Sequence, residues 1–111
     1  LALLDEAEAL DPLLPVWCVE ERGVALYSLG RYEEALASLG RLMFQTYRSR
    51  LYRAAALVAL GRTEEASKLV KEAEAGNPGL TVANFTFKER YRDLEKRRLL
   101  RQRLEEAGLP K

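Results

Sequence analysis

The chain has 111 residues, of which 48% are apolar and 32% are charged, and its formal net charge is +1. This balance is typical of one globular domain and argues against a disordered chain. The net charge excludes a strongly basic nucleic-acid-binding domain and an acidic tail. The chain has no His and one Cys, so it lacks the commonest general base and metal ligand and cannot form an internal disulfide.

Two pairs of segments show that the sequence repeats itself with a period near 33 residues. Residues 25–35 read ALYSLGRYEEA and residues 56–66 read ALVALGRTEEA, an offset of 31 residues with eight identities. Residues 5–12 read DEAEALDP and residues 71–78 read KEAEAGNP, an offset of 66 residues, or two units averaging 33. Such self-similarity indicates a repeat protein, in which each unit packs on its neighbours.

The chain opens on residues 1–10, which match only the second helix of a repeat unit. A lone half-unit cannot bury its own apolar face, because repeat proteins rely on stacked neighbours or caps. We therefore expect at least one further helix upstream, with these residues belonging to the C-terminal part of a longer protein.

The first full unit is predicted to hold two helices, the first of them from about Val16 to Leu29. Its apolar or small residues recur at helical spacing, at Val19, Gly23, Leu26 and Leu29. Gly30 is expected to end this helix, since glycine adopts the left-handed conformation of a helix C-cap. The second helix begins near Tyr32 with two glutamates in its first turn. Its buried stripe is predicted to be Ala35, Leu39 and Leu42.

The second full unit repeats this plan with two more helices. Its first helix is predicted from about Tyr47 to Leu60, Gly61 ends it, and Thr63 is expected to cap the next helix. The buried stripe of that next helix is predicted to be Ala66, Leu69, Val70 and Ala73. The run Gly-Asn-Pro-Gly at residues 76–79 then breaks the chain.

After residue 79 the repeat pattern fades, and two further helices are expected. A short apolar and aromatic helix is predicted from Thr81. Asp93 is expected to cap a last helix from Leu94 to about Ala107. Its apolar residues on or near one face are Leu94, Leu100, Leu104 and Ala107. A closing helix with a polar face is what the end of a stack of repeats requires.

The small residues of both units resemble those of the tetratricopeptide repeat family, whose unit of ~34 residues is a helix–turn–helix. The matching positions are the small residue of the first helix (Gly23, Ala54), the glycine between the helices (Gly30, Gly61) and the central alanine of the second helix (Ala35, Ala66). The family's closing proline falls on Pro12 and Pro78, but Tyr47 stands where it is expected after the first full unit.

The resemblance implies an all-α fold, a right-handed α-solenoid of antiparallel helix pairs with a C-terminal capping helix. Residues 1–79 would form the repeats, with a half repeat at 1–12 and full repeats at about 16–46 and 47–79. Residues 80–111 would form the cap and belong to the same domain.

The tail, residues 104–111, reads LEEAGLPK. It is similar to the C-terminal ends of bacterial tetratricopeptide-containing signalling proteins, some of them attached to class III adenylate cyclase domains. This second resemblance implies a bacterial protein. A cytoplasmic location is expected because the single Cys fits a reducing compartment. It leaves open a regulatory role for this segment beside an upstream enzyme such as a nucleotide cyclase.

In the tetratricopeptide family, one face of each first helix lines a concave groove that binds a partner protein or peptide. Carried over by position, the candidate partner-binding residues here are Trp17, Glu20, Val24, Tyr27, Arg48, Leu51, Tyr52, Ala55 and Val58. Trp, Tyr and Arg are the types that dominate binding hot spots. The same side chains would instead be core if an upstream helix, or Phe85 and Phe87 of the tail, covered them. The family's carboxylate clamp of Lys and Asn is not expected, because Glu20 and Val24 occupy those positions.

Catalysis has little support in the sequence, and no catalytic, cofactor-binding or metal-binding residue is predicted. Cys18 is the only thiol and has no His to activate it, so a small, partly buried hydrophobe is the simpler interpretation. The adjacent glutamates at 20–21, 33–34 and 64–65 point in different directions on a helix and do not converge on one bond.

The charge is uneven although its sum is +1. Residues 1–40 hold two Arg and eight acidic residues, a net of −6, and residues 87–111 hold nine basic and five acidic residues, a net of +4. Four arginines of the last helix have a spacing that could meet nucleic-acid phosphates, namely Arg97, Arg98, Arg101 and Arg103. Interspersed glutamates favour a solvated face instead. The opposite charges of the two ends would also suit head-to-tail self-association.

The sequence therefore predicts a protein–protein interaction or scaffolding module without enzymatic activity, whose partner is a protein or peptide. A homo-oligomer, a regulatory segment of an enzyme and a nucleic-acid contact are the alternatives. No membrane contact is expected, since no apolar stretch approaches the ~18 residues of a spanning helix.

Overall fold

The computed structural model describes residues 16–42, 44–89 and 93–111. Within these ranges the chain is all helical and has no strand, as predicted. The helices are α2 (Val16–Ser28), α3 (Tyr32–Gly40), α4 (Tyr47–Ala59), α5 (Thr63–Gly76), α6 (Val82–Lys88) and α7 (Leu94–Glu106). The predicted helix limits agree to within one residue, and Asp93 caps α7 as expected. The predicted half repeat at 1–12 lies outside the described residues.

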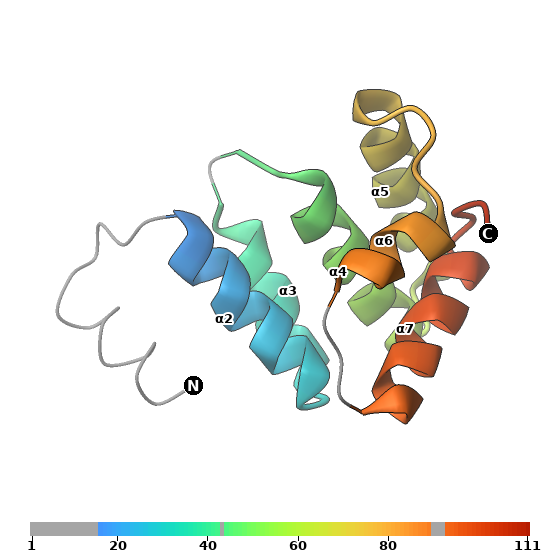
Figure 1. The fold of residues 1–111 in the computed structure, drawn as a ribbon. Helices are drawn as coiled ribbons and strands as arrows, with labels where there is room; N and C mark the ends of the chain where they lie inside the picture. Colours follow the sequence, from blue (N-terminus) through green and yellow to red (C-terminus); the bar gives the residue numbers. More distant parts are fainter. Residues whose placement is uncertain (1–15, 43, 90–92) are drawn as a thin grey trace, which may run out of the picture.

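Helices α2 to α5 pack in chain order, with α2 on α3, α3 on α4 and α4 on α5 (Figure 1). The contact between α2 and α3 is close at Gly23. A Cβ atom there would lie 2.5 Å from Leu39 Cδ2 and closer still to Leu39 Cγ, so the two helices approach this closely only because the residue is glycine. Ala54, the matching residue of α4, is fully buried. The prediction that small residues mark close helix contacts is thus confirmed at Gly23.

The turns that follow α2 and α4 share one backbone geometry. Gly30 and Gly61 both have a φ of +80°, which glycine adopts without steric cost, so both predicted helix ends are confirmed. The expected cap at Thr63 is wrong, because Thr63 is already helical and the N-cap of α5 is Arg62, which makes no side-chain cap hydrogen bond. The Arg62 guanidinium instead forms an ion pair with Glu65 in the first turn, at 2.7 Å.

The predicted stripes of α3 and α5 lie in the core except for Leu69, which is partly buried and packs against it. The stripe residues that are at most 7% exposed are Ala35, Leu39, Leu42, Ala66, Val70 and Ala73. The prediction is wrong for Leu29 and Leu94, which are 59% and 74% exposed. Leu29 follows the last residue of α2 and Leu94 is the first residue of α7, so each stands at a helix end rather than within a packed face.

The C-terminal helices fold back across α4 (Figure 1). Helix α7 packs against both α4 and α6, and its Leu100 and Leu104 are fully buried in the common core. The C-terminal end of α7 is held against α5 by a 2.9 Å hydrogen bond from Ser67 Oγ to the carbonyl oxygen of Ala107. None of the helices in the described ranges combines the length and the apolar character that spanning a bilayer requires.

Candidate functional site

The groove expected on α2 and α4 is filled by the chain itself. Leu51, Tyr52 and Ala55 of α4 have no solvent exposure, and Tyr27 of α2 is 4% exposed. They share one core cluster with Phe85 of α6 and with the buried residues of α7. These four predicted partner-binding residues are therefore core residues, so their assignment to a partner-binding face is wrong and the alternative that the tail covers them holds. The physical reason is that folding α6 and α7 over an apolar face removes its area from water.

The other predicted partner-binding residues lie at the edge of this covered face. Val24 and Val58 are partly buried and pack against the core cluster. Glu20 and Arg48 are partly exposed and belong to a polar network. Trp17 falls in the first turn of α2, but its side chain lies outside the described residues. The predicted site is thus divided between the core and a polar edge.

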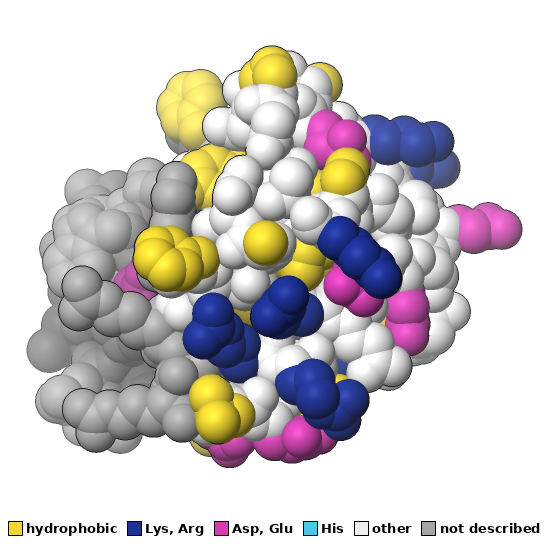
Figure 2. Space-filling model, turned by 45° about the vertical axis from the view of Figure 1, so that its right-hand side comes forward, with side chains coloured by type: hydrophobic (Ala, Val, Ile, Leu, Met, Phe, Trp, Pro, Cys, Tyr) yellow, Lys and Arg dark blue, Asp and Glu magenta, His cyan; other side chains and the backbone are white. Residues whose placement is uncertain are grey.

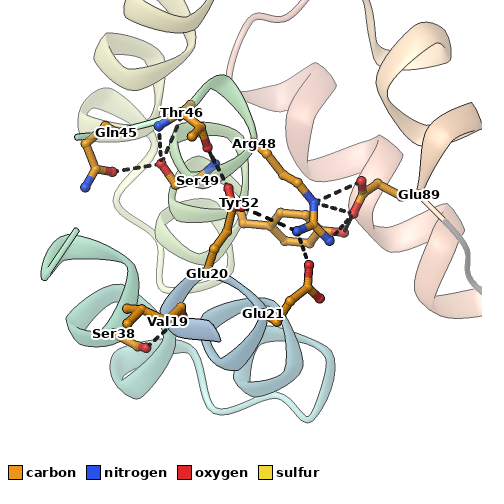
Figure 3. Close-up of polar contacts among 10 residues, drawn as sticks. All are labelled: Val19, Glu20, Glu21, Ser38, Gln45, Thr46, Arg48, Ser49, Tyr52 and Glu89. Atoms are coloured by element: carbon orange, nitrogen blue, oxygen red, sulfur yellow. Dashed lines mark hydrogen bonds and ion pairs between the residues drawn. The ribbon is translucent and has the colours of Figure 1, made fainter. Parts of the chain in front are cut away.

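Arg48 joins three separate parts of the chain (Figure 3). Its guanidinium forms ion pairs with Glu20 (3.8 Å) and Glu21 of α2, and with Glu89 (3.0 Å), the residue that follows α6. The Tyr52 hydroxyl donates a 2.6 Å hydrogen bond to Glu89 Oε1. Burial by itself would lower the pKa of Arg48, but the hydrogen bonds to Glu89 and Glu21 outweigh it and raise the pKa. Because its partners come from this chain, Arg48 holds α2, α4 and the end of α6 together.

A row of aromatic rings continues from this network through the core. The ring centroids of Tyr27 and Tyr52 lie 5.4 Å apart, and those of Tyr52 and Phe85 lie 5.7 Å apart. Tyr47 and Phe85 follow at 6.2 Å. Such tilted ring pairs stabilise by about 0.5–1.5 kcal/mol each beyond their burial. The row therefore fixes α6 on α4 and shapes the surface beside α6.

A cleft of about 640 Å³, here called the α6 cleft, lies beside this row of rings. Its lining residues are Tyr47, Gly76, Asn77, Pro78, Gly79, Leu80, Asn84, Phe85 and Phe87. Phe87 is 81% exposed, whereas Phe85 is 1% exposed. Of the two phenylalanines considered as a cover for the groove, only Phe85 covers it. Residues two positions apart on a helix point in different directions, so burial of Phe85 leaves Phe87 in solvent.

A second cleft of about 320 Å³, here called the α7 pocket, lies where the end of α2 and the start of α3 meet α7. Its lining residues are Tyr27, Ser28, Leu29, Gly30, Tyr32, Lys96, Leu99 and Arg103. The guanidinium carbon of Arg103 lies 4.9 Å from the ring centroid of Tyr32 and 5.6 Å from that of Tyr27. Arg103 Nη1 also donates a 3.0 Å hydrogen bond to the Tyr27 hydroxyl. Burial by itself would lower the pKa of Arg103, but its interactions with Tyr27 and Tyr32 raise it.

The basic residues of α7 do not share one face. Arg98 forms an ion pair with Glu95, Arg103 turns toward α2 and α3, and Arg97 has its Nε buried without a hydrogen-bond partner. Figure 2 shows Lys and Arg side chains spread over the face that is turned forward, with acidic and apolar side chains among them. Nucleic-acid phosphates favour a continuous basic patch or stripe, so this arrangement does not favour the nucleic-acid alternative.

Cys18 is a free thiol in α2 and is 8% exposed, which suits a small core hydrophobe. In the described ranges, no group of three or more Cys, Asp or Glu side chains is arranged to hold a metal ion. The adjacent glutamates that open α3 and α5 are exposed, where they complement the positive end of each helix dipole.

Sequence reasoning missed both clefts, although each left a signal in the sequence. The Gly-Asn-Pro-Gly run at residues 76–79 was interpreted only as a break, and it forms one wall of the α6 cleft. Lys96 and Arg103 are seven residues apart, a spacing that places both on one side of α7 beside the α7 pocket.

Comparisons of the chain with protein-family models, with curated proteins and with solved structures found no match. Function is therefore inferred from the two clefts and from the charged and apolar side chains that line them.

Proposed function

We propose that this chain is a protein-interaction module of tetratricopeptide-like helix pairs arranged as a right-handed solenoid, which binds a partner protein at the α6 cleft. The observation that carries the proposal is Phe87, a large apolar side chain that is 81% exposed beside a cleft of about 640 Å³. The close contact at Gly23 and the shared geometry of Gly30 and Gly61 support the repeat plan.

The lining of the α6 cleft suits an apolar side chain of a partner. Tyr47, Leu80 and Phe87 supply apolar and aromatic walls, and exposed aromatic anchors beside a concave surface are typical of binding hot spots. The side-chain amide of Asn84 already donates to the carbonyl oxygen of Gly79 at 3.1 Å. The Asn84 side chain therefore rigidifies one wall of the cleft, and a partner would bind mainly through the apolar surface.

Site-specific photo-crosslinking tests this proposal in cells of the natural source. A photoreactive phenylalanine replaces Phe87 in one variant and Gln102, an exposed residue of α7, in the matched control. We expect a discrete cross-linked protein from position 87 and none from position 102. Phe87→Ala should weaken the purified complex at least about 30-fold, since truncating a hot-spot aromatic costs about 2 kcal/mol or more.

The same substitution should leave the thermal unfolding midpoint nearly unchanged, because Phe87 is mostly in solvent. Equal cross-linking from positions 87 and 102 would contradict a specific site. A cross-link only to a second copy of this chain would indicate self-association instead of a separate partner, and it would also overturn the proposal.

A further inference from the structure

The α7 pocket presents two cations that have no carboxylate partner among the described residues. Lys96 and Arg103 both line the pocket, and their separation of seven residues in the sequence corresponds to roughly 10 Å along the axis of α7. Arg103 interacts with the rings and hydroxyl groups of Tyr27 and Tyr32, and Lys96 forms no ion pair with another described residue. The stacked guanidinium is held in place before any ligand arrives, which lowers the entropic cost of binding.

No carboxylate side chain of the neighbouring elements is among the described residues that line the pocket. At the start of α3, Glu34 forms an ion pair with Arg31. On α7, Glu95 pairs with Arg98. The positive charge of Lys96 and Arg103 is therefore not neutralised at the pocket.

Two leucines give the rest of the pocket wall an apolar part. Leu29 is 59% exposed although it is a large apolar residue, and Leu99 is partly exposed on the opposite side, on α7. A volume of about 320 Å³ is at the small end of the range for ligand sites, and it suits one large apolar side chain with an adjoining charged group. The pocket thus combines an apolar wall with two cations.

We infer that the α7 pocket binds an acidic peptide segment of a partner protein, in which a carboxylate adjoins a large apolar side chain. The apolar side chain would lie between Leu29 and Leu99, and the carboxylate would meet Arg103 and Lys96. Arg binds carboxylates through charge-assisted hydrogen bonds. This inference rests on the proposed role in protein binding, but it concerns a cleft separate from the one beside Phe87.

Peptide binding measured by fluorescence anisotropy tests the inference with the full chain. The probe is a labelled, C-terminally amidated heptapeptide, Gly-Asp-Leu-Asp-Leu-Asp-Gly. Two control peptides replace either every Asp by Lys or every Leu by Ser. We expect saturable binding of the probe and at least about tenfold weaker binding of both controls, because each lacks one of the two attractions. The same peptide with a free C-terminus distinguishes a terminal carboxylate from a side-chain carboxylate as the preferred group.

Charge reversal at two positions of α7 provides the matched comparison. Lys96→Glu should raise the Kd of the probe about tenfold or more, while Arg101→Glu should change it by less than about threefold, because Arg101 is exposed but does not line the pocket. Leu29→Ser should also raise the Kd about tenfold. Leu29 and Lys96 are both exposed, so neither substitution should unfold the chain. The thermal unfolding midpoint of each variant checks this.

Three results would overturn the inference. One is the absence of saturable probe binding by the wild-type chain at concentrations up to about 1 mM. Another is an equal loss from Lys96→Glu and Arg101→Glu, which would indicate non-specific charge attraction. The third is tighter binding of single-stranded oligothymidine than of the peptide, which would assign the cations to phosphates. None of these results affects cross-linking from position 87, so the two proposals fail separately.

Discussion

Replacing Gly23 by alanine tests how closely α2 packs on α3. The added Cβ would lie 2.5 Å from Leu39 Cδ2 and closer still to Leu39 Cγ, whereas ordinary contact begins at 3.4 Å, so the methyl group needs at least 0.9 Å of additional room. Leu39 has no solvent exposure and belongs to the core cluster, and close-packed cores offer little space for it to move. The helices must therefore separate or a core side chain must leave its preferred rotamer.

The expected magnitude is the difference between two effects of known sign. Inserting a methyl group into a packed core costs about 1–3 kcal/mol. Alanine recovers about 0.5–1 kcal/mol relative to glycine within a helix. The net loss in the free energy of unfolding should be about 1–2 kcal/mol, which lowers the melting temperature of a domain of this size by about 4–12 °C.

Thermal and urea unfolding followed by circular dichroism measures the effect. Gly40→Ala is the matched control, because a Cβ at Gly40, the last residue of α3, would meet no atom within 4 Å, and its stability should not fall. In a double-mutant cycle, Leu39→Ala should cost at least about 1 kcal/mol less in the Gly23→Ala background, since the new methyl group occupies the space that leucine leaves. A Gly23→Ala variant as stable as wild type, or strictly additive costs, would refute the close contact.

Two further predictions concern polar contacts. Tyr52→Phe removes the hydroxyl that donates to Glu89 at 2.6 Å. The free energy of unfolding, measured in urea, should fall by about 1.5–3 kcal/mol, as is typical of hydrogen bonds to charged groups. An unchanged free energy of unfolding would mean that this bond does not hold the end of α6. The pKa of Glu65 in the folded chain is lowered by the hydrogen bonds that it accepts from Arg62. The ionised Glu65 side chain therefore stabilises the folded chain above the unfolded pKa, and this stabilisation is lost as the pH falls through the folded pKa. Glu65→Gln should therefore lower the melting temperature near neutral pH, and the difference from wild type should shrink as the pH falls below 4.5; a difference that grows in acid would contradict this sign.

The sequence alone determined the features that depend on near neighbours along the chain. Apolar residues at three- and four-residue spacing located the helices and the stripes of α3 and α5, because one helix turn brings such residues together. Gly30 and Gly61 located two helix ends, because the left-handed conformation there favours glycine. The repeated small residues indicated a close helix contact, and Gly23 makes one with Leu39.

Only the tertiary structure decided which apolar surfaces cover one another. Periodicity shows that one side of α4 is apolar, but it does not say whether a partner or the chain's own α7 covers that side, and here α6 and α7 bury Tyr52. The polar contacts follow the same rule, since Arg48 and Glu89 are 41 residues apart and Tyr27 and Arg103 are 76 residues apart. Such contacts depend on how the whole chain closes, and they leave Phe87 and Lys96, rather than Tyr27 or Leu51, at the surface.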